Sequence, residues 1–193
     1  LRSLWEYHAS AFKFHSGLST PHTYSSQAWQ WLILGRPTSY FYESPKLGSA
    51  GCTVKSCSEA ILNIGNPAIW WAFIPAILVG LFVFLLKRDW RFGALLVVFG
   101  AGYFPWFMYP TRTMFYFYAL SFEPFLILLL AGVLGLALSG ARGSVLRARL
   151  GVTLVAIYLV GVLVLSAYFM PLWTAQVIPY EQWYSHMWFK SWI

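Results

Sequence analysis

The sequence predicts an all-α membrane protein with four membrane-spanning helices and an ordered region outside the membrane before the first of them. Composition is the first observation behind this prediction: 59% of the 193 residues are hydrophobic, 20% are aromatic and only 10% are charged. Soluble domains carry about 25% charged residues, so this chain could not cover its surface in water. The second observation is a series of long apolar runs, and the third is the gathering of basic residues in short connections between them.

Four runs are long enough to cross about 30 Å of hydrocarbon, which takes roughly 20 helical residues. They are Pro67–Leu86, Phe92–Tyr109, Met114–Leu138 and Leu150–Pro171. Glu123 is the one charged residue inside them, and none of the four has an amphipathic face. Any one run could be a buried helix of a soluble protein, but four in succession favour a membrane bundle.

The first span has a clear start signal. Asn66 can cap the helix, and Pro67 fits the first helical position, where a missing N–H costs nothing. Trp70 and Trp71 follow at the depth of the membrane interface, where aromatic side chains concentrate. These residues predict that the helix begins at or next to Pro67.

Short basic loops indicate the orientation. The segment Lys87–Arg91 joins the first two spans, and Arg142, Arg147 and Arg149 lie between the last two. Short loops rich in Lys and Arg stay in the cytoplasm, which places the connection around Tyr109–Arg112 outside. The amino-terminal region also carries basic residues, but long flanking regions cross largely regardless of charge. We therefore expect a multi-pass plasma-membrane protein with both ends extracytoplasmic.

The predicted chain has three parts: an extracytoplasmic region (residues 1–65), a four-helix transmembrane bundle (66–171) and an extracytoplasmic, aromatic-rich interfacial tail (172–193). Apolar and aromatic residues recur at helical spacing in residues 1–20, which predicts an amphipathic helix on the outer membrane surface. From Thr20 to Gly65 no alternation is long enough to predict a sheet. The chain begins at Leu1 without a signal peptide, so we expect a piece of a longer protein.

The net charge of +7 does not indicate nucleic-acid binding. Proteins that bind phosphate backbones carry basic residues in a patch or stripe on a soluble face. Here the basic residues stand beside and between apolar runs, as membrane topology requires. We expect the lipid bilayer to be the partner, and no nucleic acid.

Cys52 and Cys57 are the only cysteines. Five residues apart in a loop with Gly and Ser, they could close a small disulfide ring in an oxidising compartment or remain two free thiols. We expect the disulfide. A zinc site needs four ligands, and no nearby pair of histidines completes a set, so we expect no metal site.

No convincing catalytic centre is visible in the residues themselves. The six carboxylates are neither adjacent nor at helical spacing, and no catalytic triad order, glycine-rich phosphate loop or metal motif occurs. His8 and His15 would share a helix face, but about 10 Å of helix rise separates them, which is too far to bind one metal ion. Either could simply be an interfacial histidine.

Arg112 is more informative, since it lies in a tight outer turn after Pro110, at the start of the third predicted span. The first and third helices would point their partially positive amino-terminal ends outward there. An arginine at this depth could bind phosphate, or it could reach ordinary lipid headgroups. Glu123, followed by Pro124, is either a functional intramembrane group or a neutral acid that bonds a carbonyl group freed by the proline.

Six segments then stand in a characteristic order: WEYHASAFKFH (Trp5–His15), PHTYSSQAWQW (Pro21–Trp31), GRPTSYFY (Gly35–Tyr42), ILNIGNPAIWW (Ile61–Trp71), FPW (Phe104–Trp106) and RTMFYFY (Arg112–Tyr118). Together they cover nearly the whole chain. In order and spacing the chain resembles the carboxy-terminal four-helix module of the protein O-mannosyltransferases, in an actinobacterial style. Several motifs in register make the resemblance specific.

The resemblance implies a GT-C-type enzyme that transfers mannose from polyprenyl-phosphate mannose to Ser or Thr of exported proteins. The family's catalytic acidic pair lies in an amino-terminal module outside this sequence, so we expect no catalytic residue here and no cofactor. This part would form the lipid-donor groove and scaffold. The residues expected near the lipid phosphate are Arg112, Arg36 and His22, and further groove candidates are His8, His15, Tyr24 and Trp29.

There is one departure from the family pattern. Many relatives carry His after the arginine, where this chain has Phe117 and Tyr118, so a role that rests on those histidines does not carry over. The expected partners are polyprenyl-phosphate mannose, an exported acceptor polypeptide and the amino-terminal module of the same enzyme. The alternatives are a non-catalytic membrane subunit that binds a partner through its outer region, and a lipid-phosphate transporter. A transporter should carry polar residues along its spans, where only Glu123 qualifies.

Overall fold

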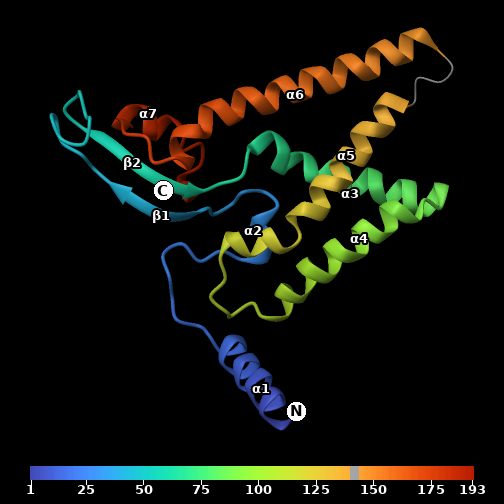
Figure 1. Cartoon of the computed structure of the whole chain (residues 1–193), viewed down its shortest axis with the longest axis horizontal. Helices are drawn as coiled ribbons and strands as arrows, with labels where there is room; N and C mark the ends of the chain where they lie inside the picture. The colour runs from blue at the N-terminus through green and yellow to red at the C-terminus, as the bar shows by residue number, and fades with distance from the viewer. Residues whose placement is uncertain (140–143) are drawn as a thin grey trace.

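The structure is a computed structural model that describes residues 1–139 and 144–193 (Figure 1). Its helices are α1 (Arg2–Ser16), α2 (Ala28–Trp31), α3 (Pro67–Lys87), α4 (Trp90–Tyr103), α5 (Glu123–Ser139), α6 (Val145–Trp173) and α7 (Tyr180–Ser185). The 3-10 helices are η1 (Phe104–Met108), η2 (Tyr116–Ser121) and η3 (Lys190–Trp192), and the strands are β1 (Thr38–Glu43), β2 (Cys57–Asn63) and β3 (Ile178–Pro179). Arg142, which we assigned to a cytoplasmic loop, lies outside the described residues.

Three helical segments of the described chain are long and apolar enough to cross a membrane: α3, α4 with η1, and α6. Helix α5 is also apolar but has 17 residues. Helix α3 packs against α4, α5 and α6, and the buried residues of these helices include Phe73, Leu126, Leu129 and Phe169. Much of the apolar surface of α6 stays exposed, which suits contact with lipid. The prediction of a mostly helical membrane protein is confirmed.

Helix α3 begins as the sequence predicts. The Asn66 side chain accepts hydrogen bonds from the N–H groups of Ala68 and Ile69, at 2.9 and 3.4 Å. Its amide nitrogen donates to the Val162 carbonyl oxygen and to Ser166 Oγ, at 2.9 and 2.8 Å. One side chain therefore caps α3 and also ties it to α6.

The third apolar helix begins later than predicted. Residues after Met114 form η2, and α5 starts only at Glu123. Pro124 is compatible with this start, because a proline fits the first turn of a helix, where its missing N–H would have no intrahelical acceptor. Glu123 therefore lies in the first turn of α5, not within the span, and a carboxylate is favourable at a helix amino-terminus.

The last helix begins earlier than predicted. It starts at Val145, so Arg147 and Arg149 lie in its first turns and not in the preceding loop. Further along α6, Gly151 lies so close to the Ala137 carbonyl group of α5 that a Cβ atom there would collide with backbone. This glycine permits the close approach of the two helices.

The all-α prediction is wrong in one respect, because the chain also forms a three-stranded sheet with the order β1-β2-β3. β1 and β2 are antiparallel, with a bulge between Ser39 and Phe41, and Ser58 of β2 pairs with Ile178 of β3. The strands are short, the bulge breaks the alternation, and the third strand comes from the opposite end of the chain. The segment before α3 and the segment after α6 thus share one sheet.

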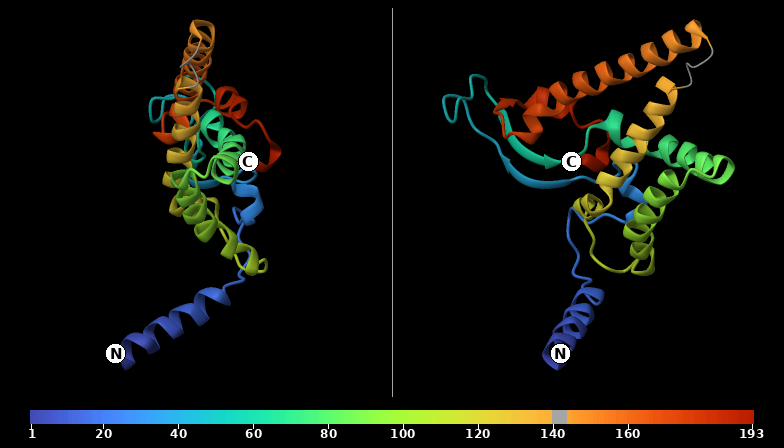
Figure 2. Two further views of the ribbon diagram at one scale, coloured as in Figure 1. Left: turned by 90° about the vertical axis from the view of Figure 1, so that its right-hand side faces the viewer. Right: turned by 45° about the vertical axis from the view of Figure 1, so that its right-hand side comes forward.

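The predicted disulfide joins Cys52, in the loop between β1 and β2, to Cys57, the first residue of β2, with an S–S distance of 2.03 Å. The predicted amino-terminal helix is present as α1. It has no buried residue and projects away from the rest of the molecule (Figures 1 and 2). Its apolar side chains, such as Trp5 and Phe12, are exposed. Its position on a membrane surface remains a prediction.

Candidate functional site

Arg112 is held in a turn that is bonded to the segment following α1. Its N–H donates to the Tyr109 carbonyl oxygen at 3.1 Å, which closes the turn. The next residue, Thr113, donates from its N–H to the Leu18 carbonyl oxygen at 2.9 Å and from its hydroxyl to the Thr20 carbonyl oxygen. These bonds join the turn to the segment that follows α1.

The Arg112 guanidinium group lies among aromatic rings. Its Cζ atom is 5.3 Å from the ring centroids of both Trp106 and Tyr118, within the range of cation–π attraction. Its Nε atom donates to the His15 carbonyl oxygen at 2.6 Å. Its Nη1 atom is buried and has no hydrogen-bond partner in the described part of the chain. The guanidinium group therefore retains capacity to bind an anion.

A cavity of about 610 Å³ adjoins this arginine. Its lining residues are Phe12, His15, Ser16, Pro105, Trp106, Tyr109, Arg112 and Tyr118. Within the described part of the chain, Arg112 is the only arginine or lysine in this lining, and no carboxylate belongs to it. Mostly apolar walls with one permanent positive charge fit an amphiphile that carries an anionic group. A guanidinium group is well suited to phosphate, because its planar array of donors matches two phosphate oxygens.

Among the predicted site residues, the structure brings His15 and Arg112 together. Tyr118, one of the two residues that stand where many relatives were expected to carry His, lines the same cavity and lies beside the Arg112 guanidinium group. The sequence predicted that the amino-terminus of the third apolar helix would lie beside Arg112 and favour phosphate. It does not lie there, because α5 begins only at Glu123. Arg112 must act through its own charge and its aromatic surroundings.

Arg36 lies elsewhere and is already engaged. Its Nη1 atom donates to the carbonyl oxygens of Ser191 and Ile193, at 2.6 and 2.7 Å, and its Nη2 atom donates to the Thr23 carbonyl oxygen at 2.9 Å. It also stacks on the Tyr24 ring, 5.3 Å from the centroid. In this arrangement Arg36 joins the segment before α2 to the carboxy-terminal tail.

The other predicted residues do not line the Arg112 cavity. His22 is exposed, accepts a hydrogen bond on Nδ1 from the Tyr24 N–H at 3.1 Å, and packs against Phe115. His8 and Trp29 are exposed, and Tyr24 lines a different cavity. No group of three metal-binding side chains comes together in residues 1–139 and 144–193.

Glu123 lines a small cavity of about 180 Å³ together with Asn63 and Tyr116. The Tyr116 hydroxyl is buried and has no hydrogen-bond partner among the described residues. The Asn63 amide donates to the Tyr40 hydroxyl at 3.0 Å. This polar pocket lies where the end of β2 meets the start of α5, apart from the Arg112 cavity.

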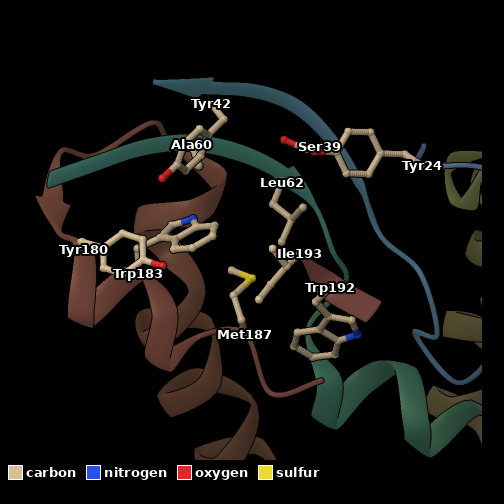
Figure 3. A pocket seen from close by; sticks show the side chains of 10 residues that line it. All are labelled: Tyr24, Ser39, Tyr42, Ala60, Leu62, Tyr180, Trp183, Met187, Trp192 and Ile193. Atoms are coloured by element: carbon tan, nitrogen blue, oxygen red, sulfur yellow. The ribbon is translucent and has the colours of Figure 1, made fainter. Parts of the chain in front are cut away.

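Two features of the carboxy-terminal tail were missed from the sequence. One is a second aromatic cavity, between the sheet and the tail (Figure 3). The other is His186, which is buried and has ring nitrogens 2.6 and 2.7 Å from the carbonyl oxygens of Gln182 and Tyr168. The aromatic richness of the tail was visible, but its contact with the sheet depends on the β2–β3 pairing, which no local pattern reveals.

The fold defines a mostly helical membrane protein, and Arg112 lies in the largely apolar wall of one of its cavities. The family model described as the C-terminal four-transmembrane region of protein O-mannosyltransferase matches residues 1–192. The chain belongs to this family, as the sequence motifs predicted.

Curated relatives support the same family. The chain is 35% identical over 196 residues to a polyprenol-phosphate-mannose–protein mannosyltransferase of Mycolicibacterium smegmatis, with 100% of this chain and 38% of the relative covered. Proteins of the same name from Mycobacterium tuberculosis H37Rv and Corynebacterium glutamicum are also 35% identical, with 100% and 96% of this chain covered. The chain spans 37% and 36% of the length of those two relatives.

A solved structure shows the same fold. It is that of the Saccharomyces cerevisiae protein O-mannosyltransferase Pmt1–Pmt2 complex bound to the sugar donor, with a TM-score of 0.76 and 23% sequence identity. The match covers 98% of this chain and 26% of the yeast chain. At this level of identity the likeness establishes the architecture of the chain and nothing more specific.

Proposed function

We propose that this chain is the carboxy-terminal part of an enzyme that transfers mannose from polyprenyl-phosphate mannose to Ser or Thr of exported polypeptides. The observation that carries the proposal is the 35% identity, over the whole chain, to proteins with this activity in their names. Because the chain spans about 38% of such a relative, the catalytic carboxylates would come from the amino-terminal module. None of the described residues that line the Arg112 cavity is a carboxylate, which agrees with that division.

The proposed topology has four spans with both ends outside the plasma membrane. At 17 residues, α5 is near the lower limit of about 17–25 residues for a spanning helix, and η2 precedes it directly. The basic residues of the α3–α4 connection and of the first turns of α6 would then face the cytoplasm. The sheet, α1 and the Arg112 cavity would lie on the outer side, where exported polypeptides pass.

Arg112 is the proposed contact for the phosphate of the lipid donor. The support is its Nη1 atom, which has no hydrogen-bond partner among the described residues, its aromatic surroundings and the apolar cavity beside it. A polyprenyl phosphate has the same two-part chemistry, an anionic head on an apolar chain. Positive charge at the phosphate stabilises it as a leaving group while the bond to the sugar breaks. The apolar lining would contact the first isoprene units.

The activity can be tested on the full-length protein, purified in detergent. It is incubated with radiolabelled polyprenyl-phosphate mannose and a peptide that contains Ser and Thr, beside a matched peptide with Ala at those positions. Label should appear in the first peptide only. Label that remains entirely on the lipid, under conditions where a known relative transfers it, would refute the proposed function and favour a binding subunit or transporter.

A further inference from the structure

A second cavity, separate from the Arg112 cavity, lies between the sheet and the carboxy-terminal tail. Its volume is about 300 Å³, at the lower end of the range of about 300–1,000 Å³ for small-molecule sites. Figure 3 shows Tyr180 and Trp183 on one side and Trp192 and Ile193 on the other, with residues of the sheet along the top. A cavity of this size accommodates one ring-sized group.

The walls of this cavity are held in place by hydrogen bonds and packing. The Trp192 indole N–H donates to the Leu34 carbonyl oxygen at 2.6 Å, and Trp183 packs against Tyr42 with ring centroids 5.2 Å apart. Arg36 binds the main chain at the very end of the tail. Because the walls are already ordered, a ligand would pay little to organise them.

The lining is neutral, aromatic and rich in hydroxyl groups. Among the residues that the structure describes, no acidic or basic side chain lines it, which disfavours a phosphate-bearing ligand such as the lipid donor. Hydroxyls come from Tyr24, Ser39, Tyr42 and Tyr180. Those of Tyr24 and Tyr180 make no hydrogen bond within residues 1–139 and 144–193. An entirely apolar ligand would cover these hydroxyls without replacing their bonds to water, at a cost in free energy.

We propose that this cavity binds a neutral hexose attached to polypeptide, namely a mannose already transferred to the acceptor. A pyranose ring has apolar C–H faces that can pack on the Tyr180 and Trp183 rings, and hydroxyls around its edge that can pair with the tyrosine and serine hydroxyls. The inference rests on the proposed function, since it takes its ligand from the product of that reaction. It assigns the tail and sheet a role in holding modified acceptors.

The test uses full-length enzyme without lipid donor and a synthetic peptide that carries a single O-mannosyl threonine, with the unmodified peptide as reference. Binding is measured by titration calorimetry. We expect the mannosyl peptide to bind more tightly than the unmodified peptide, and methyl α-mannoside to displace it. Tyr180→Phe, which keeps the ring and removes the hydroxyl, should weaken mannosyl-peptide binding about three- to tenfold.

Tyr184→Phe is the matched control, because Tyr184 lies one turn further along α7, is exposed and does not line the cavity. It should leave binding unchanged. Equal affinity for the two peptides, no displacement by methyl α-mannoside, or equal effects of the two Tyr→Phe variants would each overturn the inference. Mannose transfer to the unmodified peptide is assayed in parallel. If transfer persists while any of these results is found, the subsite is wrong and the proposed function stands.

Discussion

Replacing Arg112 with alanine removes a permanent positive charge and one hydrogen bond from the wall of the larger cavity. The bond from Nε to the His15 carbonyl oxygen is structural, and its loss should cost about 0.5–1.5 kcal/mol of stability. A bond from the guanidinium group to the donor phosphate would be worth roughly 1.5–3 kcal/mol. Its loss corresponds to about a ten- to hundredfold decrease in kcat/KM for the lipid donor.

The assay measures initial rates of mannose transfer by the full-length enzyme at limiting polyprenyl-phosphate mannose, with saturating acceptor peptide. Arg112→Ala should show the full decrease. Arg112→Lys should recover only part of the activity, because an ammonium group keeps the charge but lacks the planar array of donors. Membrane insertion and thermal unfolding are checked for each variant, so that a loss of protein is not read as a loss of binding.

Thr113→Val provides the matched control. It removes a side-chain hydrogen bond between the same two segments, from Thr113 to the Thr20 carbonyl oxygen, and leaves the charge in place. We expect its kcat/KM for the donor to stay within about twofold of the parent enzyme, the size of a difference of roughly 0.4 kcal/mol. If Thr113→Val is as impaired as Arg112→Ala, the arginine acts only as a tether. If Arg112→Ala is fully active at limiting donor, the phosphate binds elsewhere.

Four further outcomes are expected. Gly151→Ala should destabilise the protein by about 1–3 kcal/mol in thermal unfolding, because the added Cβ atom meets the backbone of α5. Gly161→Ala is the control and should have no such effect, because Gly161 faces open space. Equal effects of the two substitutions would contradict the close approach of α5 and α6. Asn66→Ala should lower the unfolding temperature, because it removes a helix cap worth about 1 kcal/mol and the hydrogen bonds to α6. An unchanged unfolding temperature would show that the cap is dispensable. Arg36→Gln should increase hydrogen exchange in the carboxy-terminal tail, and unchanged protection would mean that other contacts hold the tail. A reporter fused at Thr111 should read as external, and a cytoplasmic signal would refute the four-span topology.

Much of the transmembrane part could be predicted because its signals are local. Apolar length predicted the regions of α3, α4 and α6, and the Asn66–Pro67 pair predicted the start of α3 correctly. The start of α5 was predicted too early, because the residues from Met114 onward are already largely apolar. Hydropathy measures apolar length and does not distinguish the 3-10 turns of η2 from an α-helix.

The candidate site was predictable only in part. Arg112 could be selected as a site candidate because it lies in a turn between two apolar runs. Its contact with His15 could not be predicted, because the acceptor is a main-chain oxygen, which every residue type has. Arg36 looked equivalent from sequence. Its guanidinium group is instead bound by carbonyl oxygens at the far end of the chain. Which arginine stays available to a ligand depends on which carbonyl groups the fold brings beside each one.

The sequence by itself determined the membrane class, the family, the helix cap and the pair of cysteines, because each depends on residue type or on neighbours along the chain. Only the tertiary structure decided the sheet, the cavities and the different surroundings of Arg112 and Arg36. The clearest case is β3, two residues long, which no local pattern could predict. It forms because the tail beyond α6 returns to the edge of β2, where its main-chain groups find hydrogen-bond partners.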